Sequence, residues 1–170
     1  MKGVFSITKN SFLFLCCVFI FADSFSQNKP CTNALTNGGF ELPVQAFCFC
    51  NESTVPDWNT TETTGLIELW PSGFQGVPAY QGNQFAEINA NVDSSLYINI
   101  CTPCATTMTW EFAHRGRSGV DACALRMGPP GGPYTIVGTF SDGNTAWGFH
   151  TGTYAVPTGQ TITRMDFKAI

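Results

Sequence analysis

The sequence predicts an all-β sandwich, and three observations support this fold class. Helical periodicity is nearly absent after residue 26. Short runs rich in aromatic and β-branched residues alternate with clusters of Gly, Pro, Asn, Asp and Ser, which is typical of sandwiches of antiparallel strands. In the run 107–114, Met108, Trp110, Phe112 and His114 occupy one face, as the two-residue period of a strand requires. Trp110 is therefore expected in the core.

Eight strands are expected, and turn-forming residues separate them. They are Gly39–Leu42, Leu66–Trp70, Gln84–Asn89, Ser95–Cys101, Thr107–His114, Ala122–Met127, Tyr134–Phe140 and Ile162–Ile170. Turn chemistry is explicit in Gly128-Pro-Pro-Gly-Gly-Pro133 and in Ser141-Asp-Gly-Asn144. The last run still reads as a strand at the final residue, so we expect the chain to be a fragment of a longer protein.

Residues 1–26 are predicted to be a signal peptide. Lys2 and Lys9 form a basic segment, and residues 12–22 form an apolar core that is too short to span a bilayer as a helix. Ser24 and Ser26 supply small residues at the two positions that a signal peptidase reads. Residues 27–170 have the length of one domain. We therefore expect a single domain, secreted or displayed at the cell surface, with no membrane insertion.

Six cysteines follow the predicted signal peptide, and an even number in an exported chain predicts disulfide bonds. They are Cys31, Cys48, Cys50, Cys101, Cys104 and Cys123. Three disulfides are expected, and the sequence leaves 15 pairings open. Cys101 and Cys104 have the C-x-x-C spacing of redox and zinc sites. The rest of a zinc quartet and the βαβ setting of a redox motif are missing, so structural disulfides are favoured.

Positive charge is scarce. No Lys or Arg occurs from Pro30 to Ala113, whereas eight carboxylates do. Without Lys2, Lys9 and Asp23 of the signal peptide, the chain has six basic and eleven acidic side chains. The absence of a basic stripe argues against nucleic acid and against an anionic membrane surface as partners. A neutral surface rich in Thr, Asn, Gly and Gln suits an extracellular binding domain.

Polar candidates for a ligand site fall into two groups. His114, Arg115, Arg117 and Asp121 follow an aromatic strand, and guanidinium forks bind carboxylates or sugar hydroxyls. Alternatively, Arg117 and Asp121 close the loop between them. Glu68 and Glu87 are expected on one polar sheet face with Asn89 and Asn91, where carboxylates and amides can bond sugar hydroxyls. Equally, these two carboxylates could pair with Arg115 or Arg117.

Four aromatic residues are candidates for stacking on a sugar ring: Trp58, Trp70, Tyr80 and Trp147. Trp70 and Tyr80 rank first, because the intervening segment 71–78 reads as a surface loop. The alternative for each is a place in the core or as a plug under a loop.

Several strings resemble a family of secreted bacterial surface domains of the Bacteroidetes type. They are Asn37-Gly-Gly-Phe-Glu41, Val55-Pro-Asp-Trp58, Ile67-Glu-Leu-Trp70, residues 79–91, Ser95-Leu-Tyr97, His114-Arg-Gly-Arg117 and residues 154–161. The opening Asn-Gly-Gly-Phe-Glu with the later Pro-x-Trp resembles the galactose-binding-like jelly roll, which many carbohydrate-binding modules share. The resemblance implies a structural Ca²⁺ near Glu41 and Asn37. It also implies a closing strand that this chain lacks, so the jelly roll is expected to be truncated at its C-terminal strand.

These observations together predict a non-catalytic extracellular module that binds a polysaccharide or glycan, or that mediates cell-surface adhesion, within a larger multidomain surface protein. One alternative is a structural spacer of such a protein. A second is a small glycosidase or lyase that uses Glu68 and Glu87 as acid and base, which requires both carboxyls to face a substrate cleft.

Overall fold

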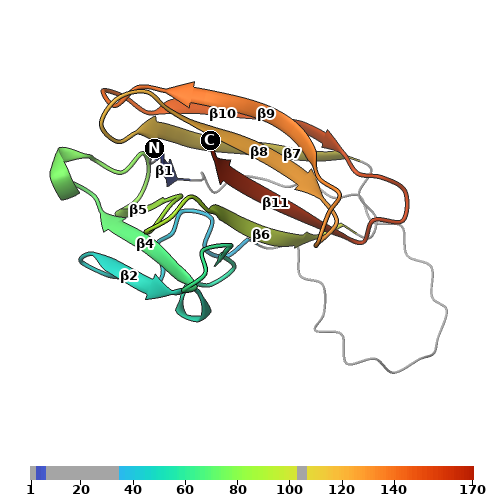
Figure 1. Ribbon diagram of the computed structural model, residues 1–170, viewed down its shortest axis with the longest axis horizontal. Coiled ribbons are helices and arrows are strands. Elements are labelled where there is room, and N and C mark those ends of the chain that lie inside the picture. Colours follow the sequence, from blue (N-terminus) through green and yellow to red (C-terminus); the bar gives the residue numbers. More distant parts are fainter. Residues whose placement is uncertain (1–2, 7–34, 103–106) are drawn as a thin grey trace.

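The protein is a sandwich of two antiparallel sheets. The computed structural model describes residues 35–102 and 107–170 and the backbone of residues 3–6 (Figure 1). The strands are β1 Gly3–Ser6, β2 Cys48–Asn51, β3 Asn59–Thr60, β4 Leu66–Pro71, β5 Gln84–Glu87, β6 Ser95–Cys101, β7 Thr107–Gly116, β8 Asp121–Gly128, β9 Thr135–Asp142, β10 Gly148–Ala155 and β11 Ile162–Ala169. Two 3₁₀ turns, η1 Glu52–Thr54 and η2 Phe74–Gly76, lie between strands.

Six strands form one sheet in the order β10-β7-β1-β5-β4-β2, and five form the other in the order β3-β6-β11-β8-β9. Every pair of neighbouring strands is antiparallel. The predicted all-β sandwich is confirmed. Over the described part of the chain, no helix is long and apolar enough to cross a membrane.

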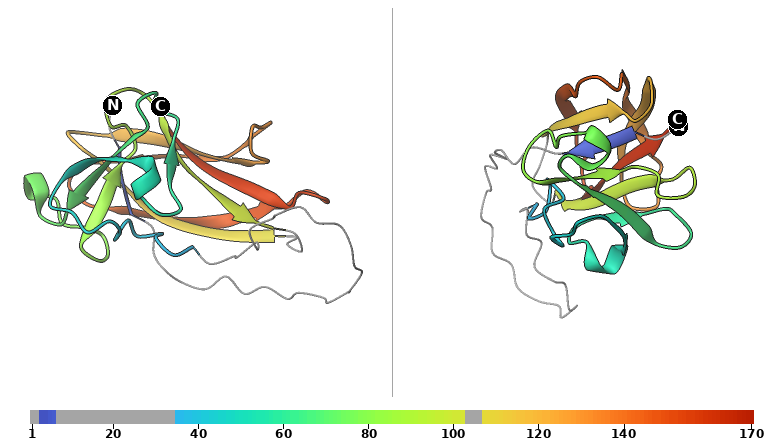
Figure 2. Two further views of the ribbon diagram at one scale, coloured as in Figure 1. Left: turned by 90° about the horizontal axis from the view of Figure 1, so that it is seen from below. Right: turned by 90° about the vertical axis from the view of Figure 1, so that its left-hand side faces the viewer.

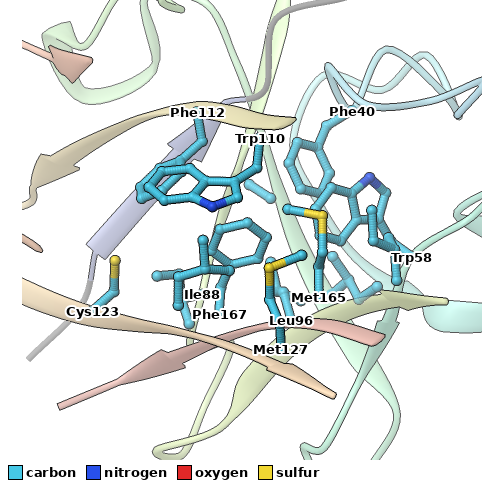
Figure 3. Packing of buried hydrophobic residues seen from close by; sticks show 14 of the residues in the cluster. Phe40, Trp58, Ile88, Leu96, Trp110, Phe112, Cys123, Met127, Met165 and Phe167 are labelled. Carbon is cyan, nitrogen blue, oxygen red and sulfur yellow. The ribbon is translucent and has the colours of Figure 1, made fainter. Parts of the chain in front are cut away.

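The core lies between the two sheets and is lined by alternate residues of their strands. Figure 3 shows Trp110 and Phe112 of β7 packing toward Phe167 of β11. Trp110 is 6% exposed, as expected for a core residue. Ile67 and Leu69 of β4 extend the core at its other end. This inward set leaves the intervening residues of β4 and β7 on the opposite face of the six-stranded sheet.

Seven of the eight expected strands are present, with bounds that shift by a few residues at most. The expected strand Gly39–Leu42 is wrong. Phe40 has a positive φ of 58° and its backbone N–H donates to the carbonyl of Asn37 at 3.0 Å, which makes a turn. Phe40 stacks instead on Trp58, with ring centroids 4.3 Å apart. Trp58 is 1% exposed, so it is a core residue and cannot serve as a stacking platform.

Four strands were not expected, and β10 is the longest of them. Its glycines hide the strand pattern, but Gly152 is required by packing. A Cβ at Gly152 would lie 2.4 Å from the ring of Trp110 on the neighbouring strand. Glycine normally weakens a strand, but here Gly152 allows β10 to pair with β7.

The cysteines agree with the disulfide expectation in part. Cys48 and Cys50 are bonded to each other within β2, and Cys101 is also disulfide-bonded. Cys31 and Cys104 lie outside the described residues. The expectation for Cys123 is wrong: it is a free thiol, completely buried on the core side of β8 (Figure 3). Burial raises the pKa of the Cys123 thiol to about 12, so the group is held as an unreactive thiol.

Candidate functional site

The face of the six-stranded sheet that points away from the core is the outer face. Its register places Glu68 opposite Glu87 and Trp70 opposite Phe85. The residues that alternate with the core set are Phe49 of β2, Glu68 and Trp70 of β4, Phe85 and Glu87 of β5, Thr109 and Glu111 of β7, and Phe149, Thr151 and Thr153 of β10. This face therefore combines aromatic rings, hydroxyls and carboxylates.

Eight aromatic side chains form an unbroken series of contacts across the outer face, which we call the aromatic belt. In order from β2 to β10 they are Phe49, Phe47, Phe74, Trp70, Phe85, Trp147, Tyr80 and Phe149. Successive ring centroids are 4.8 to 6.3 Å apart, which is the normal separation of interacting rings. The belt links segments that are far apart in the sequence.

The segment 72–83 covers the centre of the belt. Trp70 and Phe85 are 1% and 0% exposed and pack with Val77. The indole N–H of Trp147 donates to the carbonyl of Pro78 at 2.9 Å and ties this segment down. The expectation that Trp70 is an exposed stacking platform is therefore wrong, because the loop that was expected to present it covers it.

The two ends of the belt are open. At one end Tyr80 and Phe149 are 40% and 47% exposed, and their rings are nearly parallel, with an angle of 11° and centroids 6.0 Å apart. At the other end Phe47 and Phe49 are 38% and 45% exposed. Groups of neighbouring exposed apolar rings are a feature of ligand and partner sites on protein surfaces. Tyr80 is thus exposed as expected, while the belt's other exposed rings were not expected.

A buried polar cluster lies beside Trp70. Nη1 of Arg117 donates to both carboxylate oxygens of Glu87 at 3.2 Å, and the guanidinium lies 4.9 Å from the centre of the Trp70 ring. The indole N–H of Trp70 donates to Oε1 of Glu68 at 2.9 Å. Glu87 is 0% and Glu68 is 3% exposed. Of the two alternatives for Glu87, pairing with Arg117 is the one the structure has.

This burial argues against the glycosidase or lyase alternative. The two carboxylates are neighbours on adjacent strands, but neither faces an open cleft. Asn89 does not join them: it is buried, and its Oδ1 accepts the backbone N–H of Ser94 at 2.9 Å, which closes the loop after β5. Asn91 is exposed in that loop. Of the four polar side chains expected on one sheet face, only Glu68 and Glu87 lie together, and both are buried.

The run 114–121 is divided between the two faces of β7. His114 is fully buried, and its Nδ1 lies 2.8 Å from Oδ2 of Asp142, the same atom that Nε2 of His150 contacts at 2.8 Å. Burial lowers the pKa of His114, and the hydrogen bond and charge of Asp142 oppose that shift. Arg115 donates to the carbonyl of Asn144.

Asp121 closes the loop to Arg117, as one alternative expected, but it bonds the backbone of Arg117 and not its guanidinium. Its Oδ2 accepts the backbone N–H of Arg117 at 2.8 Å, so the carboxylate closes the turn through the main chain. The guanidinium of Arg117 is directed to Glu87 instead. These contacts support the loop rather than a ligand.

A pocket of about 180 Å³ lies at the corner where Ca²⁺ is implied. It is lined by Thr36, Asn37, Gly38, Gly39, Glu41, Gln81 and Gly82. Calcium takes six to eight oxygen ligands. Oε1 of Glu41 accepts the backbone N–H groups of Asn83 and Gln84 at 2.8 and 3.1 Å, and Oε2 accepts from Nδ2 of Asn83 at 3.2 Å.

Asn37 is engaged as well. Its Oδ1 accepts the N–H of Leu42 at 2.9 Å, and its Nδ2 donates to the carbonyl of Leu42 at 2.7 Å. Within the described ranges, no group of three or more His, Cys, Asp or Glu side chains could hold a metal ion. In the structure Glu41 and Asn37 anchor the chain at this corner, and the implied Ca²⁺ stays a prediction.

Phe47, Phe49 and Phe149 are the site residues that sequence reasoning missed. A signal existed for Phe149, because Phe149, Thr151 and Thr153 alternate as in a strand with one face in water. The glycines at 148 and 152 obscured it. Phe47 and Phe49 alternate with Cys48 and Cys50 in a segment for which no strand was expected, so no local pattern marked them.

Comparisons with known proteins show which solved structures have a similar fold. No family model and no curated protein matches the sequence. Among solved structures, TmCBM61 in complex with beta-1,4-galactotriose is similar with a TM-score of 0.51 and 17% identity over 81% of this chain and 87% of that chain. The C-terminal family 22 carbohydrate-binding module of Clostridium thermocellum Xyn10B has a TM-score of 0.50 and 15% identity over 70% and 79%. The chain thus has the β-sandwich fold found in these carbohydrate-binding modules.

Proposed function

We propose that this protein is a non-catalytic extracellular module that binds polysaccharide through the open end of the aromatic belt formed by Tyr80 and Phe149. The observation on which the proposal rests is this pair of nearly parallel, exposed rings on the outer face of the sheet. Each ring offers a flat apolar surface that can stack on the apolar face of a pyranose. The ring of Trp147 makes an edge contact with that of Tyr80, with centroids 6.3 Å apart.

The surroundings of this ring pair suit a neutral sugar chain. On β10 and β7, the exposed side chains of Thr151, Thr153 and Thr109 follow Phe149 on the same face. Hydroxyl groups both donate and accept hydrogen bonds, so this row can bond successive sugar hydroxyls. Oγ1 of Thr151 already donates to the carbonyl of Trp110 at 3.0 Å and would act there as an acceptor. The rings would supply affinity, and the row of hydroxyls would orient the chain along β10.

Two further facts support this role. The similar solved structures are carbohydrate-binding modules, and one of them was solved with beta-1,4-galactotriose. Residues 1–26 have the character of a signal peptide, which would place the domain where polysaccharides occur. Adhesion at a cell surface would use the same face if the polysaccharide belongs to another cell.

The test is a binding panel with the full 170-residue chain, checked for folding by circular dichroism. Neutral plant and algal polysaccharides, including β-1,4-galactan, are measured by affinity electrophoresis with the parent chain and with Tyr80→Ala/Phe149→Ala. Loss of stacking from two rings is expected to weaken binding about tenfold or more. Ile136→Ala, which removes an exposed side chain from the other sheet, is the matched control and should bind as the parent does.

Chelator is added in a second arm. Stacking on Tyr80 and Phe149 requires no metal ion, so binding should be unchanged by chelator as long as the chain stays folded. If no polysaccharide binds to the folded chain, or if the double variant binds as well as the parent, the proposal is wrong. Silence across the panel would favour the structural spacer.

A further inference from the structure

Positive charge in the described part of the chain gathers on the outer face of the five-stranded sheet. Residues 165 and 167 of β11 belong to the core, so Arg164 and Lys168 point away from it. Arg126 of β8 lies on the same face for the same reason. Figure 1 labels β11 between β6 and β8, and in Figure 2 it can be followed in red to the label C. Of the five basic residues in the described ranges, only Arg115 and Arg117 lie elsewhere.

The single carboxylate that the strands place on this face is already neutralised. Asp166 of β11 is 2% exposed, and Nε and Nη2 of Arg126 donate to its Oδ1 at 2.9 and 2.7 Å. The other acids of these strands, Asp121 and Asp142, are each two residues from a core residue and therefore share the core side. An anion that approaches the face is thus attracted by the two other cations without repulsion from an unpaired carboxylate of these strands.

The guanidinium of Arg164 is held in a fixed orientation. Its central carbon lies 3.7 Å from the centre of the Tyr97 ring, and its Nε donates to Oδ1 of Asn99 at 2.9 Å. Among the described residues, neither terminal nitrogen of this guanidinium has a partner. A planar guanidinium fork binds a planar carboxylate through two parallel hydrogen bonds. Because the stack on Tyr97 orders the side chain in advance, less conformational entropy is lost when a carboxylate binds.

Lys168 supplies a second unpaired cation on the same strand. It follows Arg164 by four residues, which corresponds to about 13 Å along a β-strand. Within the part of the chain that the structure describes, its ammonium makes no ion pair. Two such cations in a row suit a ligand with repeated negative charges better than a single small anion. Nucleic acid is disfavoured, because Arg164 covers the Tyr97 ring on which a base would stack and two cations contact few phosphates.

We propose that this face is a second glycan site, at which an acidic polysaccharide lies along β11 and its carboxylates bind Arg164 and Lys168. Arg164 binds one carboxylate through two hydrogen bonds, and Lys168 attracts a later one as a point charge. The exposed amide of Asn99 can donate to a sugar hydroxyl beside them. The site lies on the opposite sheet from the aromatic belt and does not depend on it. Together with the belt, it would let one module hold a neutral and an acidic chain on its two faces.

The test measures binding of the full 170-residue chain to polygalacturonate, whose sugars carry carboxylates, by isothermal titration calorimetry at low ionic strength. Dextran sulfate and oligothymidylate are the comparison anions, with sulfate and phosphate in place of carboxylate. The variants are Arg164→Gln, Arg164→Lys and Tyr80→Ala/Phe149→Ala, and circular dichroism checks that each is folded. Arg115→Gln is the matched control, because it removes the same charge from the other sheet.

Polygalacturonate should bind the parent chain, and more weakly as salt is added, because exposed charges are screened. Arg164→Gln should weaken binding about tenfold or more, since it removes charge-assisted hydrogen bonds. Arg164→Lys should weaken it by about threefold or more, because lysine keeps the charge but not the planar fork. Arg115→Gln and the variant that lacks both belt rings should bind as the parent does.

No binding of polygalacturonate to the folded parent would overturn the proposal. So would equal losses in Arg115→Gln and Arg164→Gln, or full binding by Arg164→Lys, because net charge alone would then explain the attraction. Dextran sulfate or oligothymidylate bound as tightly as polygalacturonate would also overturn it, since the face would then accept any polyanion. A loss confined to Tyr80→Ala/Phe149→Ala would place the acidic chain on the belt instead. Neutral polysaccharides are measured separately on the same variants, so failure at one face is distinguishable from failure at the other.

Discussion

At the scale of single residues, the outer face depends on how its buried charges are neutralised. Glu87 has no exposure to water, and Arg117 supplies two charge-assisted hydrogen bonds to it while remaining 28% exposed. Their pairing is one of the two alternatives that the sequence leaves open. The choice between pairing and ligand binding depends on the burial of Glu87, which is set by tertiary packing and not by the local pattern.

Arg117→Met is expected to destabilise the protein by about 2 kcal/mol, because it removes charge-assisted hydrogen bonds from a buried carboxylate. Chemical denaturation of the full chain measures the loss. In the double variant Arg117→Met/Glu87→Gln the charge to be neutralised is gone, so part of the stability should return. Equal losses in the single and double variants would contradict this account of the pair.

His114 gives the fold a pH dependence whose sign follows from its lowered pKa. The ordinary pKa is near 6.5, and burial lowers it in the folded protein. Below pH 6.5 the unfolded chain therefore binds a proton that the folded chain resists, and stability falls as the pH falls. Above pH 6.5 this contribution is fully present. The slope from this one group cannot exceed about 1.4 kcal/mol per pH unit.

Denaturation midpoints of the parent and of His114→Asn, measured from pH 7.5 to pH 5, test this sign. The Asn amide can still donate to Asp142 but does not titrate in this range. The parent should lose stability more steeply than the variant as the pH falls. Parallel curves would show that His114 is not the titrating group.

At the scale of elements, glycines decide where β7 ends. A Cβ at Gly116 would lie 2.1 Å from the carbonyl oxygen of Gly119 and 2.8 Å from that of Asp142, both of which are backbone atoms. Three residues later, Gly119 has nothing within 4 Å of the same position. The turn from β7 to β8 thus requires a hydrogen at one glycine and tolerates a side chain at the other.

Gly116→Ala is expected to lower the free energy of unfolding by about 2 kcal/mol, since the backbone must shift to admit the methyl group. Gly119→Ala is the control and should change it by less than about 0.5 kcal/mol. Thermal unfolding of both variants gives the comparison. The account of this turn fails if the two substitutions have the same effect.

Elements with strong alternation were predictable, and the others were not, for physical reasons. Residues 95–101 and 107–114 follow the two-residue period because one face of each strand meets the core. β10 was missed because Trp110 demands a glycine opposite it. The strand expected at 39–42 failed because Phe40 takes a left-handed conformation to reach Trp58. Tertiary packing determined both the strand β10 and the turn at Phe40, and a local sequence pattern carries no information about such packing.

At the scale of the whole molecule, composition and turn spacing were enough to predict the sandwich but not the face that it would use. The residues of the aromatic belt come from β2, β4, β5 and β10 and from three connecting segments. Their contacts arise only when the order β10-β7-β1-β5-β4-β2 is formed. Of the tryptophan and tyrosine candidates, the sheet left Tyr80 exposed, covered Trp70 with a loop and placed Trp58 in the core.

The belt also explains why so small a domain leaves large rings in water at two places. Its buried centre adds a second apolar cluster outside the main core, which fixes the segment 72–83 on the sheet. The open ends are then held on a rigid support, so a ligand can stack on them without ordering a loop first. Such preorganisation favours binding, because less conformational entropy is lost.

The most direct measurement of the proposed role is a map of the bound glycan on the folded chain. Two-dimensional ¹H–¹⁵N NMR spectra are recorded as the best-binding oligosaccharide from the panel is titrated. The account predicts that shifts concentrate at Tyr80, Phe149 and the threonines of β10 and β7, with little change at the Glu41 corner. Shifts centred on that corner, or on the five-stranded sheet, would contradict it.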